Sequence, residues 1–310
     1  MFNKFSNKSL IIVFGALLIV VVAMFFFDAG KTERTFKSEL ISIDTTKVTK
    51  VVIYPKAPKN EPIRIVKSGD EWKVELKDGK LAPGSDSRIK SVFTQLLTIN
   101  PTRLAARGED RFAEFQVDSS AAHVQVFEGS SMVADVVLGK FSMDQATRQM
   151  ANFVRLAGDE NIYEIKGFLS LSHDSDASIF RNKKIVEGGY TDWNSVKFEY
   201  PGDSSFVMNK VSDVWQINGT PTDSAETVKY LRALSNLNGT KFIDNANPDD
   251  LMNPAYKVTI EKEQGEINIE GYVSGDNLYV RSTLNPESIF NGNEGKLKEK
   301  LFIGPDKLKK

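Results

Sequence analysis

The order of secondary-structure patterns repeats along this chain, and this repetition limits the possible folds more than any single motif. Each half shows three strand patterns, one helical pattern and three further strand patterns. The strand patterns cover residues 48–54, 63–66, 72–76, 123–127, 132–138 and 153–156 in the first half, and 196–200, 206–208, 215–217, 258–260, 267–269 and 279–281 in the second. Two copies of a β-β-β-α-β-β-β unit are the simplest account.

The two helical patterns occupy matching places in the copies, with apolar residues at helical spacing. These residues are Ile89, Val92, Phe93, Leu96 and Ile99 in the first copy, and Val228, Leu231, Leu234 and Leu237 in the second. Asp223 and Glu226 have the form of a capping box at the start of the second helix. A single register aligns Leu96 with Leu234, Ile99 with Leu237, Thr102 with Thr240, and Arg103 with Lys241.

The segments between these patterns are predicted to be irregular. Strict alternation places Trp72, Val74 and Leu76 on one buried face of a strand. Residues 141–150 are predicted to form a loop between the last two strands of the first copy. Residues 166–193 have isolated apolar spots without a sustained period, which predicts a linker partly packed on both lobes.

A long apolar run precedes the repeats. Residues 10–27, from Leu10 to Phe27, contain no charge and no proline. As a helix they would extend about 27 Å, close to the ~30 Å hydrocarbon core of a bilayer. A helix packed on a protein surface should carry polar residues on one face, whereas this run is apolar on all sides. A buried core helix is the less favoured interpretation. The sequence therefore predicts a transmembrane helix with the lipid bilayer as its partner.

A cleaved signal peptide is the alternative interpretation of the same run. Lys4 and Lys8 provide a basic head, and residues 21–23 resemble a cleavage site. That site lies inside the apolar run and is followed by residues 25–27, which are all phenylalanine. An uncleaved signal anchor is therefore favoured. A lipoprotein anchor is excluded because the chain contains no cysteine.

The orientation of this anchor follows from chain length more than from charge. Lys4 and Lys8 precede the run, and Lys31, Arg34 and Lys37 follow it, so the positive charges do not decide the orientation. Long domains translocate largely regardless of charge. We therefore expect a single-pass protein of the inner (cytoplasmic) membrane with a periplasmic C-terminal body.

Length and composition set the remaining expectations. The 310 residues exceed one typical core. We expect an α+β protein with a tail, anchor and stalk at 1–42, a first lobe at 43–165, a linker at 166–193 and a second lobe at 194–310. A net charge of −1 gives no electrostatic case for nucleic acid. The absence of cysteine excludes disulfides, thiolate metal sites and cysteine nucleophiles.

Two serine motifs are candidates for catalysis. Gly202-Asp203-Ser204 resembles an esterase nucleophile motif, but both histidines, His123 and His173, precede it, and a hairpin turn explains it. Ser87 and Lys90 fit the Ser-x-x-Lys of penicillin-recognising enzymes, but the companion motifs are missing and the second copy has Ala225 in place of the serine. A first-turn serine and a solvated lysine explain this pair. The sequence thus assigns no catalytic residue and predicts that the chain is not an enzyme.

Three further groups are candidates for binding or modification. Residues 173–176, His-Asp-Ser-Asp, offer metal ligands but lack the rest of any recognised loop, so a solvated linker is favoured. Arg155 and Arg281 occupy equivalent strand positions, where they could bind an anion or be solvated or paired with a carboxylate. Residues 223–225, Asp-Ser-Ala, fit either an O-glycosylation signal or a helix cap. No metal or cofactor is predicted.

Several short motifs resemble one protein family. They are Asp70-Glu71-Trp72-Lys73-Val74, the helix at 89–97, Val137-Leu138-Gly139-Lys140, Asn161-Ile162-Tyr163, Phe180-Arg181-Asn182-Lys183, and 200–206 continuing to 215–219. From about residue 48 onward the chain resembles the DUF4340 family, a domain of unknown function in membrane-anchored bacterial proteins, and its Bacteroidota version in particular. The resemblance brings no catalytic residues. It implies, by analogy with extracytoplasmic parts of gliding-motility ABC transporters, a transporter or envelope accessory role.

Three functions are compatible with the sequence. The first is a membrane-anchored extracytoplasmic interaction or scaffold protein that works with an ABC-type transporter or with gliding or envelope machinery. The second is a binding module for an envelope glycan or small ligand, which predicts an exposed aromatic cleft. The third is a hydrolase using Ser87, Ser204, His123 or His173.

Overall fold

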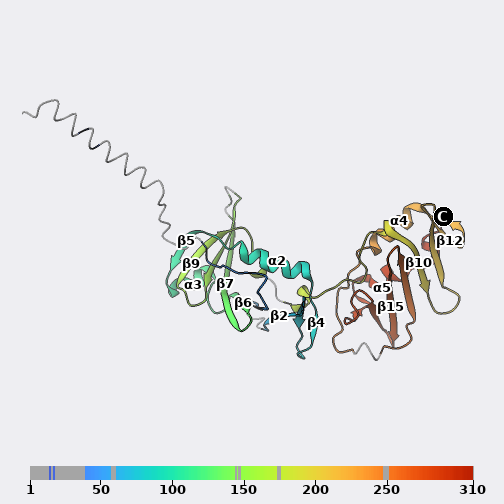
Figure 1. Ribbon diagram of the computed structural model, residues 1–310, viewed down its shortest axis with the longest axis horizontal. Helices are drawn as coiled ribbons and strands as arrows, with labels where there is room; N and C mark the ends of the chain where they lie inside the picture. Colours follow the sequence, from blue (N-terminus) through green and yellow to red (C-terminus); the bar gives the residue numbers. More distant parts are fainter. Residues whose placement is uncertain are drawn as a thin grey trace, which may run out of the picture.

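The computed structural model describes residues 14, 17, 39–56, 61–143, 145, 148–172, 176–246 and 251–309. Within these ranges the chain forms two antiparallel sheets and a few helices, which confirms a mainly β, α+β protein. The two sheets lie at opposite ends of an elongated body, and a single crossing of the chain joins them (Figure 1). The sheet with its helices that precedes this crossing is called the first lobe, and the part that follows is called the second lobe.

The described part of the first lobe contains a nine-stranded sheet with the order β4-β3-β2-β1-β6-β7-β8-β9-β5. The bounds are β1 (Lys50–Tyr54), β2 (Ile63–Ser68), β3 (Glu71–Glu75), β4 (Leu81–Pro83), β5 (Pro101–Arg107), β6 (Ala122–Glu128), β7 (Ser131–Met143), β8 (Met150–Leu156) and β9 (Asn161–Lys166). Ile53 on β1 lies opposite Ile63 on β2 and Val124 on β6. Two meanders therefore meet at β1.

The described part of the second lobe contains an eight-stranded sheet with the order β13-β12-β11-β10-β14-β15-β16-β17. The bounds are β10 (Trp193–Glu199), β11 (Phe206–Val211), β12 (Val214–Ile217), β13 (Thr220–Pro221), β14 (Tyr256–Lys262), β15 (Glu266–Ser274), β16 (Asn277–Ser282) and β17 (Phe290–Asn291). Strand β10 pairs with β11 and β14, as β1 pairs with β2 and β6. The two sheets thus share one strand order.

The correspondence extends to the far edge of each sheet. In the first lobe β5 pairs with β9. In the second lobe Phe242 forms an isolated bridge with Phe290 on β17, the Ile243 amide donates to the Ile289 carbonyl, and the Asn291 amide donates to the Lys241 carbonyl. The register that aligns Arg103 with Lys241 therefore places both residues on the last segment at equivalent sheet edges.

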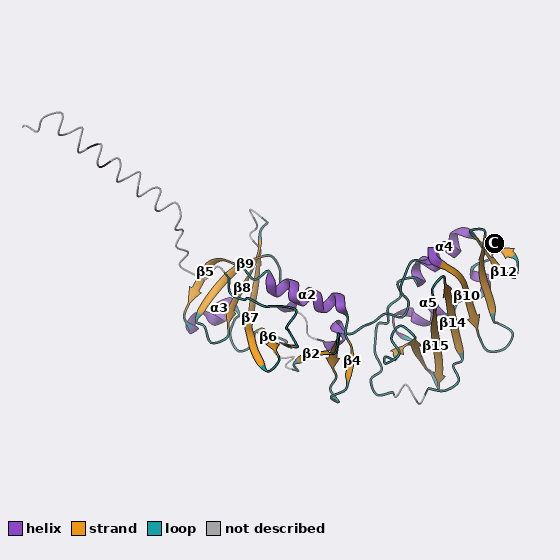
Figure 2. Ribbon diagram, in the orientation of Figure 1, coloured by secondary structure: helices purple, strands orange, loops and turns teal. Residues whose placement is uncertain are grey.

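One long helix covers a face of each sheet (Figure 2). Helix α2 (Asp86–Leu97) buries Ile89, Val92, Phe93 and Leu96 against the first sheet, as predicted. Helix α4 (Ser224–Leu234) buries Leu231 and Leu234. The Asp223 side chain accepts a hydrogen bond from the Glu226 amide, which confirms the predicted cap. The apolar faces at helical spacing thus form the two main cores.

Shorter helices complete the lobes. They are α3 (Phe112–Phe115), α5 (Leu297–Leu301) and the 3-10 turns η1 (Glu109–Arg111), η2 (Ser170–Ser172), η3 (Ala177–Phe180), η4 (Tyr190–Asp192), η6 (Glu294–Lys296) and η7 (Pro305–Lys307). Phe115 on α3 packs with Val137, Phe153 and Ile162 in a separate small cluster. The prediction of one helix per lobe was therefore incomplete.

The predicted loop at 141–150 was wrong in its boundaries. Residues 141–143 continue β7, and Met150 begins β8. Phe141 pairs with Asn152, and Met143 pairs with Met150. A β-bulge between Leu138 and Phe141 shifts the register, and most side chains at this end are exposed, so the alternation that identifies a strand from sequence is lost.

The predicted transmembrane helix lies outside the described residues, apart from Phe14 and Leu17, which are helical and exposed. In the part of the chain that the structure does describe, no helix has both the length and the apolar character needed to cross a bilayer.

Two half-buried tyrosines hold the C-terminal segment against the second lobe. The Tyr200 hydroxyl donates to the Ile303 carbonyl at 3.0 Å, and the Tyr230 hydroxyl donates to the Leu301 carbonyl at 3.1 Å. Burial raises the pKa of both phenols above their usual range. Each phenol therefore holds its proton more tightly in the folded chain than in the unfolded chain.

These tyrosines predict a loss of stability at alkaline pH. Because the folded pKa lies above the unfolded value, their contribution is fully present below about pH 10 and falls as pH rises beyond it. We expect the urea midpoint to fall as pH rises above about 10, and Tyr230→Phe to reduce that fall. At neutral pH the variant should lose about 1 kcal/mol for the missing hydrogen bond. Equal pH dependence of the variant and the wild type would contradict this assignment.

Candidate functional site

The crossing between the lobes is fixed by backbone hydrogen bonds on both sides. The Ser85 amide donates to the Phe180 carbonyl, and the Asn182 amide donates to the Pro83 carbonyl, so residues up to 182 belong to the first lobe. The Gly239 amide donates to the Lys183 carbonyl, so Lys183 is bound to the second lobe. The lobes are therefore joined through a single peptide link between two anchored residues.

The interior residues of the predicted linker are divided between the two cores. Leu169, Leu171 and Phe180 pack in the core of the first lobe. Ile185, Val186 and Trp193 pack in the core of the second. The chain thus passes from one core to the other across Arg181–Lys184, four residues of which three are charged.

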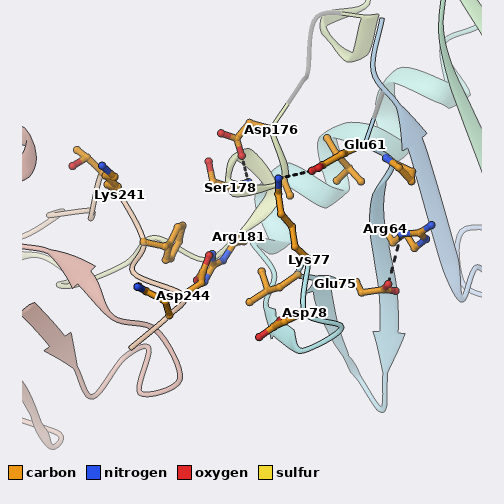
Figure 3. Close-up of a pocket in the computed structure, with 17 residues that line it drawn as sticks. Glu61, Arg64, Glu75, Lys77, Asp78, Asp176, Ser178, Arg181, Lys241 and Asp244 are labelled. Atoms are coloured by element: carbon orange, nitrogen blue, oxygen red, sulfur yellow. Dashed lines mark hydrogen bonds and ion pairs between the residues drawn. The ribbon is translucent and has the colours of Figure 1, made fainter. Parts of the chain in front are cut away.

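Arg181 reaches from this crossing into the second lobe (Figure 3). Its side chain is 5% exposed, and Nη1 lies 2.8 Å from Oδ1 of Asp244. The guanidinium carbon is 3.5 Å from the centre of the Phe242 ring. Burial lowers the pKa of Arg181, while Asp244 opposes the shift. Arg181 remains a cation because an arginine pKa is far above neutral pH. Charge pairing and ring contact together bind it to the second lobe.

Two further contacts cross the junction. The Asn285 amide group donates to the Asn182 carbonyl at 2.6 Å. Nζ of Lys73 lies 3.0 Å from Glu71 in its own lobe and 3.6 Å from Glu287 in the other. The hydrogen bond with Glu71 raises the pKa of Lys73, and burial opposes this shift. The contact of Lys73 with Glu287 lies on segments separate from Arg181, so it restricts rotation of one lobe against the other.

A cavity of about 980 Å³ with many charged residues in its wall lies beside Arg181, between the lobes. Its lining comprises Glu61, Pro62, Ile63, Arg64, Glu75, Leu76, Lys77, Asp78, Asp176, Ala177, Ser178 and Arg181 from the first lobe, and Thr240, Lys241, Phe242, Asp244 and Asn245 from the second. Lys77 pairs with Glu61 at 2.7 Å, and Arg64 with Glu75 at 3.7 Å. Charges of both signs thus neutralise one another along the wall. The aromatic lining residue, Phe242, is covered by the Arg181 guanidinium.

Among the described candidates, no hydrogen bond joins Ser87 or Ser204 to His123, and His173 lies outside the described residues. Ser204 lies after β10 in the second lobe, where its hydroxyl donates to the Pro201 carbonyl, as expected for a turn. His123 lies on β6 of the first lobe, stacked on Tyr54 at 4.2 Å. Burial lowers the pKa of His123, and Asp135 opposes this shift. Ser87 is exposed on α2, with its oxygen 3.2 Å from that of Ser85.

The metal and glycosylation candidates have structural roles where they are described. Residues 173–175 lie outside the described residues, and Asp176 caps η3 by accepting from the Ser178 amide. Across the described ranges, no three His, Cys, Asp or Glu side chains gather as a metal site would require. Asp223 caps α4, and Ser224 is exposed in its first turn.

The paired strand arginines lie on equivalent strands, β8 and β16. Arg155 donates through Nε to the Val117 carbonyl at 2.8 Å, and its guanidinium lies 4.2 Å from the Phe112 ring centre. It therefore holds the segment around α3 against the sheet. Arg281 lies beside Tyr272. Burial and Glu270 raise the pKa of Tyr272, and Arg281 partly opposes that shift. Each arginine thus has protein contacts of its own.

Sequence reasoning did not identify Arg181 as a junction residue. Arg181 appeared only as part of a family motif within a segment without periodicity. The available signal was a charged residue directly after Phe180, whose side chain proves to be 1% exposed. A buried charge needs a partner, and that of Arg181 is Asp244 in the second lobe.

Comparison with known protein families places residues 72–258 in a domain of unknown function, DUF4340. The matched range begins in the first lobe, contains the crossing at Arg181 and ends in the second lobe. Comparisons with curated proteins and with solved structures gave no match. The match covers more than half of the 310 residues, so the chain belongs to the DUF4340 family.

Proposed function

We propose that this chain is a membrane-anchored interaction or scaffold protein of the cell envelope. In this proposal residues 10–27 hold it in the inner membrane, and both lobes lie on the periplasmic side. Its partners would be components of an ABC-type transporter or of gliding or other envelope machinery. The anchor is supported by the apolar sequence, and the transporter link by sequence resemblance alone.

The observation that carries this proposal is the junction between the lobes. A scaffold of this kind would hold two binding surfaces at a fixed separation. Here the single crossing is hydrogen-bonded to both lobes, and Arg181 adds an ion pair and a ring contact across it. Two similar sheets held at one spacing provide two related surfaces for partners, which suits assembly of other proteins.

Crosslinking in native membranes tests this proposal. The full-length chain, carrying an affinity tag, is crosslinked in cells and purified under denaturing conditions, and co-purifying proteins are identified. We expect the same envelope proteins to be enriched in every replicate relative to a matched purification from cells with an untagged chain. Recovery of the chain alone, across several crosslinker lengths, would count against an interaction role.

The cavity between the lobes supports a second candidate, a binding module for a small ligand or glycan. Its volume of about 980 Å³ is large enough for a drug-sized molecule. Its wall of paired charges suits a polar ligand rather than an apolar one. A thermal-shift screen with cell-wall fragments and sugars tests this candidate, and an unchanged melting temperature with all of them would remove it.

A further inference from the structure

One hairpin of the first lobe ends in a group of exposed apolar side chains. Met143 and Met150 form the last described pair of β7 and β8, and Phe141 lies two residues before Met143 on the same strand face. Phe168, just after β9, contacts Phe141 edge-to-face at 5.4 Å. The exposed fractions are 39% for Phe141, 54% for Met143, 48% for Met150 and 47% for Phe168. These four residues are called the hairpin tip.

The hairpin tip is held in place by buried polar contacts. Asn152, which shares the strand face of Met150, is 1% exposed. Its amide group donates to the Lys140 carbonyl, and its side-chain oxygen accepts from the Leu169 amide. Leu169 is buried in the core of the first lobe. Buried Leu169 therefore fixes its neighbour Phe168 beside Phe141. The exposed position of these apolar side chains is part of the folded structure.

The second lobe lacks this feature on its equivalent hairpin. Strands β15 and β16 end with the pair Ser274 and Asn277, joined by Gly275 and Asp276, all polar or small. Val273 is exposed there, but the aromatic pair beside it is not, since Tyr272 is buried and Tyr279 is half-buried. Grouped exposed apolar side chains mark interaction surfaces. Since the second lobe folds without such a group, the group in the first lobe is not needed for the shared fold and is a candidate contact site.

The position of the first lobe in the sequence indicates what this tip contacts. The apolar run ends at Phe27, and the described body begins at Glu39. Residues 28–38 can span at most about 40 Å in any conformation. The first lobe is therefore confined near the bilayer surface if the run is in the membrane. In Figure 1 the hairpin of β7 extends beyond its sheet in the same lobe where the described chain begins.

The charged residues around the tip are mainly cations, although Asp144 follows Met143 in the sequence. Arg148 is exposed in the turn of the hairpin, and Lys166 is exposed opposite Ala151 on the neighbouring strand. Phenylalanine and methionine can enter the boundary between headgroups and acyl chains, while adjacent cations attract anionic headgroups. We propose that the hairpin tip inserts into the surface of the same bilayer that holds residues 10–27, so that the first lobe is docked on the membrane. This inference rests on the proposed anchor.

The absence of cysteine from the natural sequence permits a site-specific test. A single cysteine replaces Met143 in the full-length chain and carries a nitroxide spin label. A matched variant carries the label at Val273, which is 53% exposed near the equivalent turn of the second lobe. Both proteins are reconstituted into liposomes containing anionic lipid, and flotation confirms membrane association. Collision rates of the label with oxygen, which partitions into lipid, and with an aqueous nickel chelate are then measured.

We expect the label at position 143 to collide more with oxygen than with nickel, and the label at 273 to show the reverse. A floating protein with nickel-accessible labels at both positions would overturn the docked tip and leave the anchor intact. Dipolar broadening at 143 without preferential oxygen contact would assign the tip to a second copy of this chain and would also overturn the proposal. Failure to float would contradict both the anchor and the tip.

Discussion

The double substitution Leu18→Arg with Ile19→Arg is expected to release the chain from membranes, if the proposed anchor holds it there. These residues lie at the middle of the apolar run. One arginine at the centre of a membrane helix costs about 3 kcal/mol on insertion scales, so two cost about 6 kcal/mol. That cost removes most of the preference of such a run for the bilayer. The measurement is the fraction of chain that remains in the membrane pellet after an alkaline wash.

The matched control exchanges the same two residues, Leu18→Ile with Ile19→Leu, and keeps both length and apolar character. We expect this control to remain in the pellet like the wild type. A double-arginine variant that also remains in the washed pellet would show that the run is not what holds the chain to the membrane.

Arg181→Ala is expected to lower the free energy of unfolding by about 4 kcal/mol. The lost contact with Phe242 accounts for about 2 kcal/mol, since the cation is desolvated. The cavity left by a buried side chain accounts for about the same amount. Because Arg181 joins the lobes, its loss should also let them unfold at separate urea concentrations. Trp72 reports on the first lobe, and Trp193 and Trp215 report on the second.

Arg103→Ala is the matched control for Arg181. Arg103 also pairs with a carboxylate, that of Glu164, but its side chain is 59% exposed. An exposed ion pair contributes about 0–1 kcal/mol, so this variant should unfold close to the wild type. If Arg181→Ala changes stability no more than Arg103→Ala and keeps a single transition, Arg181 does not join the lobes.

Elements with strong local signals could be predicted from the sequence. Helix α2 was identified because four apolar residues lie at a 3.6-residue period, and α4 because Asp223 and Glu226 add a capping signal. The duplication was visible because both copies keep the same order and one register around the helix ends. The structure extends this register to the sheet edges, where Arg103 on β5 corresponds to Lys241 beside β17.

Elements whose identity depends on distant partners were missed. Strands β4, β13 and β17 have two or three residues each, too few to show a period. Strand β5 is only partly buried and pairs with β9, which follows much later in the chain. The end of the β7 hairpin is exposed on both faces, so its sequence does not alternate between apolar and polar residues as a half-buried strand does.

The candidate site could not be assembled from sequence for the same reason. Arg181, Phe242 and Asp244 come from segments without periodicity, and only tertiary structure brings them together. Their contact depends on the fold of the second lobe, which places the segment after α4 against the crossing. A family motif marked the region of Arg181 but gave no indication of its partners.

Paired reporter fusions at the C-terminus test the proposal of a membrane-held body outside the cytoplasm most directly. One fusion carries an enzyme that is active only outside the cytoplasm, and the other carries a protein that fluoresces only inside it. The account predicts high enzyme activity and no fluorescence at matched expression. Fluorescence without enzyme activity would contradict it, because the two lobes would then face the cytoplasm.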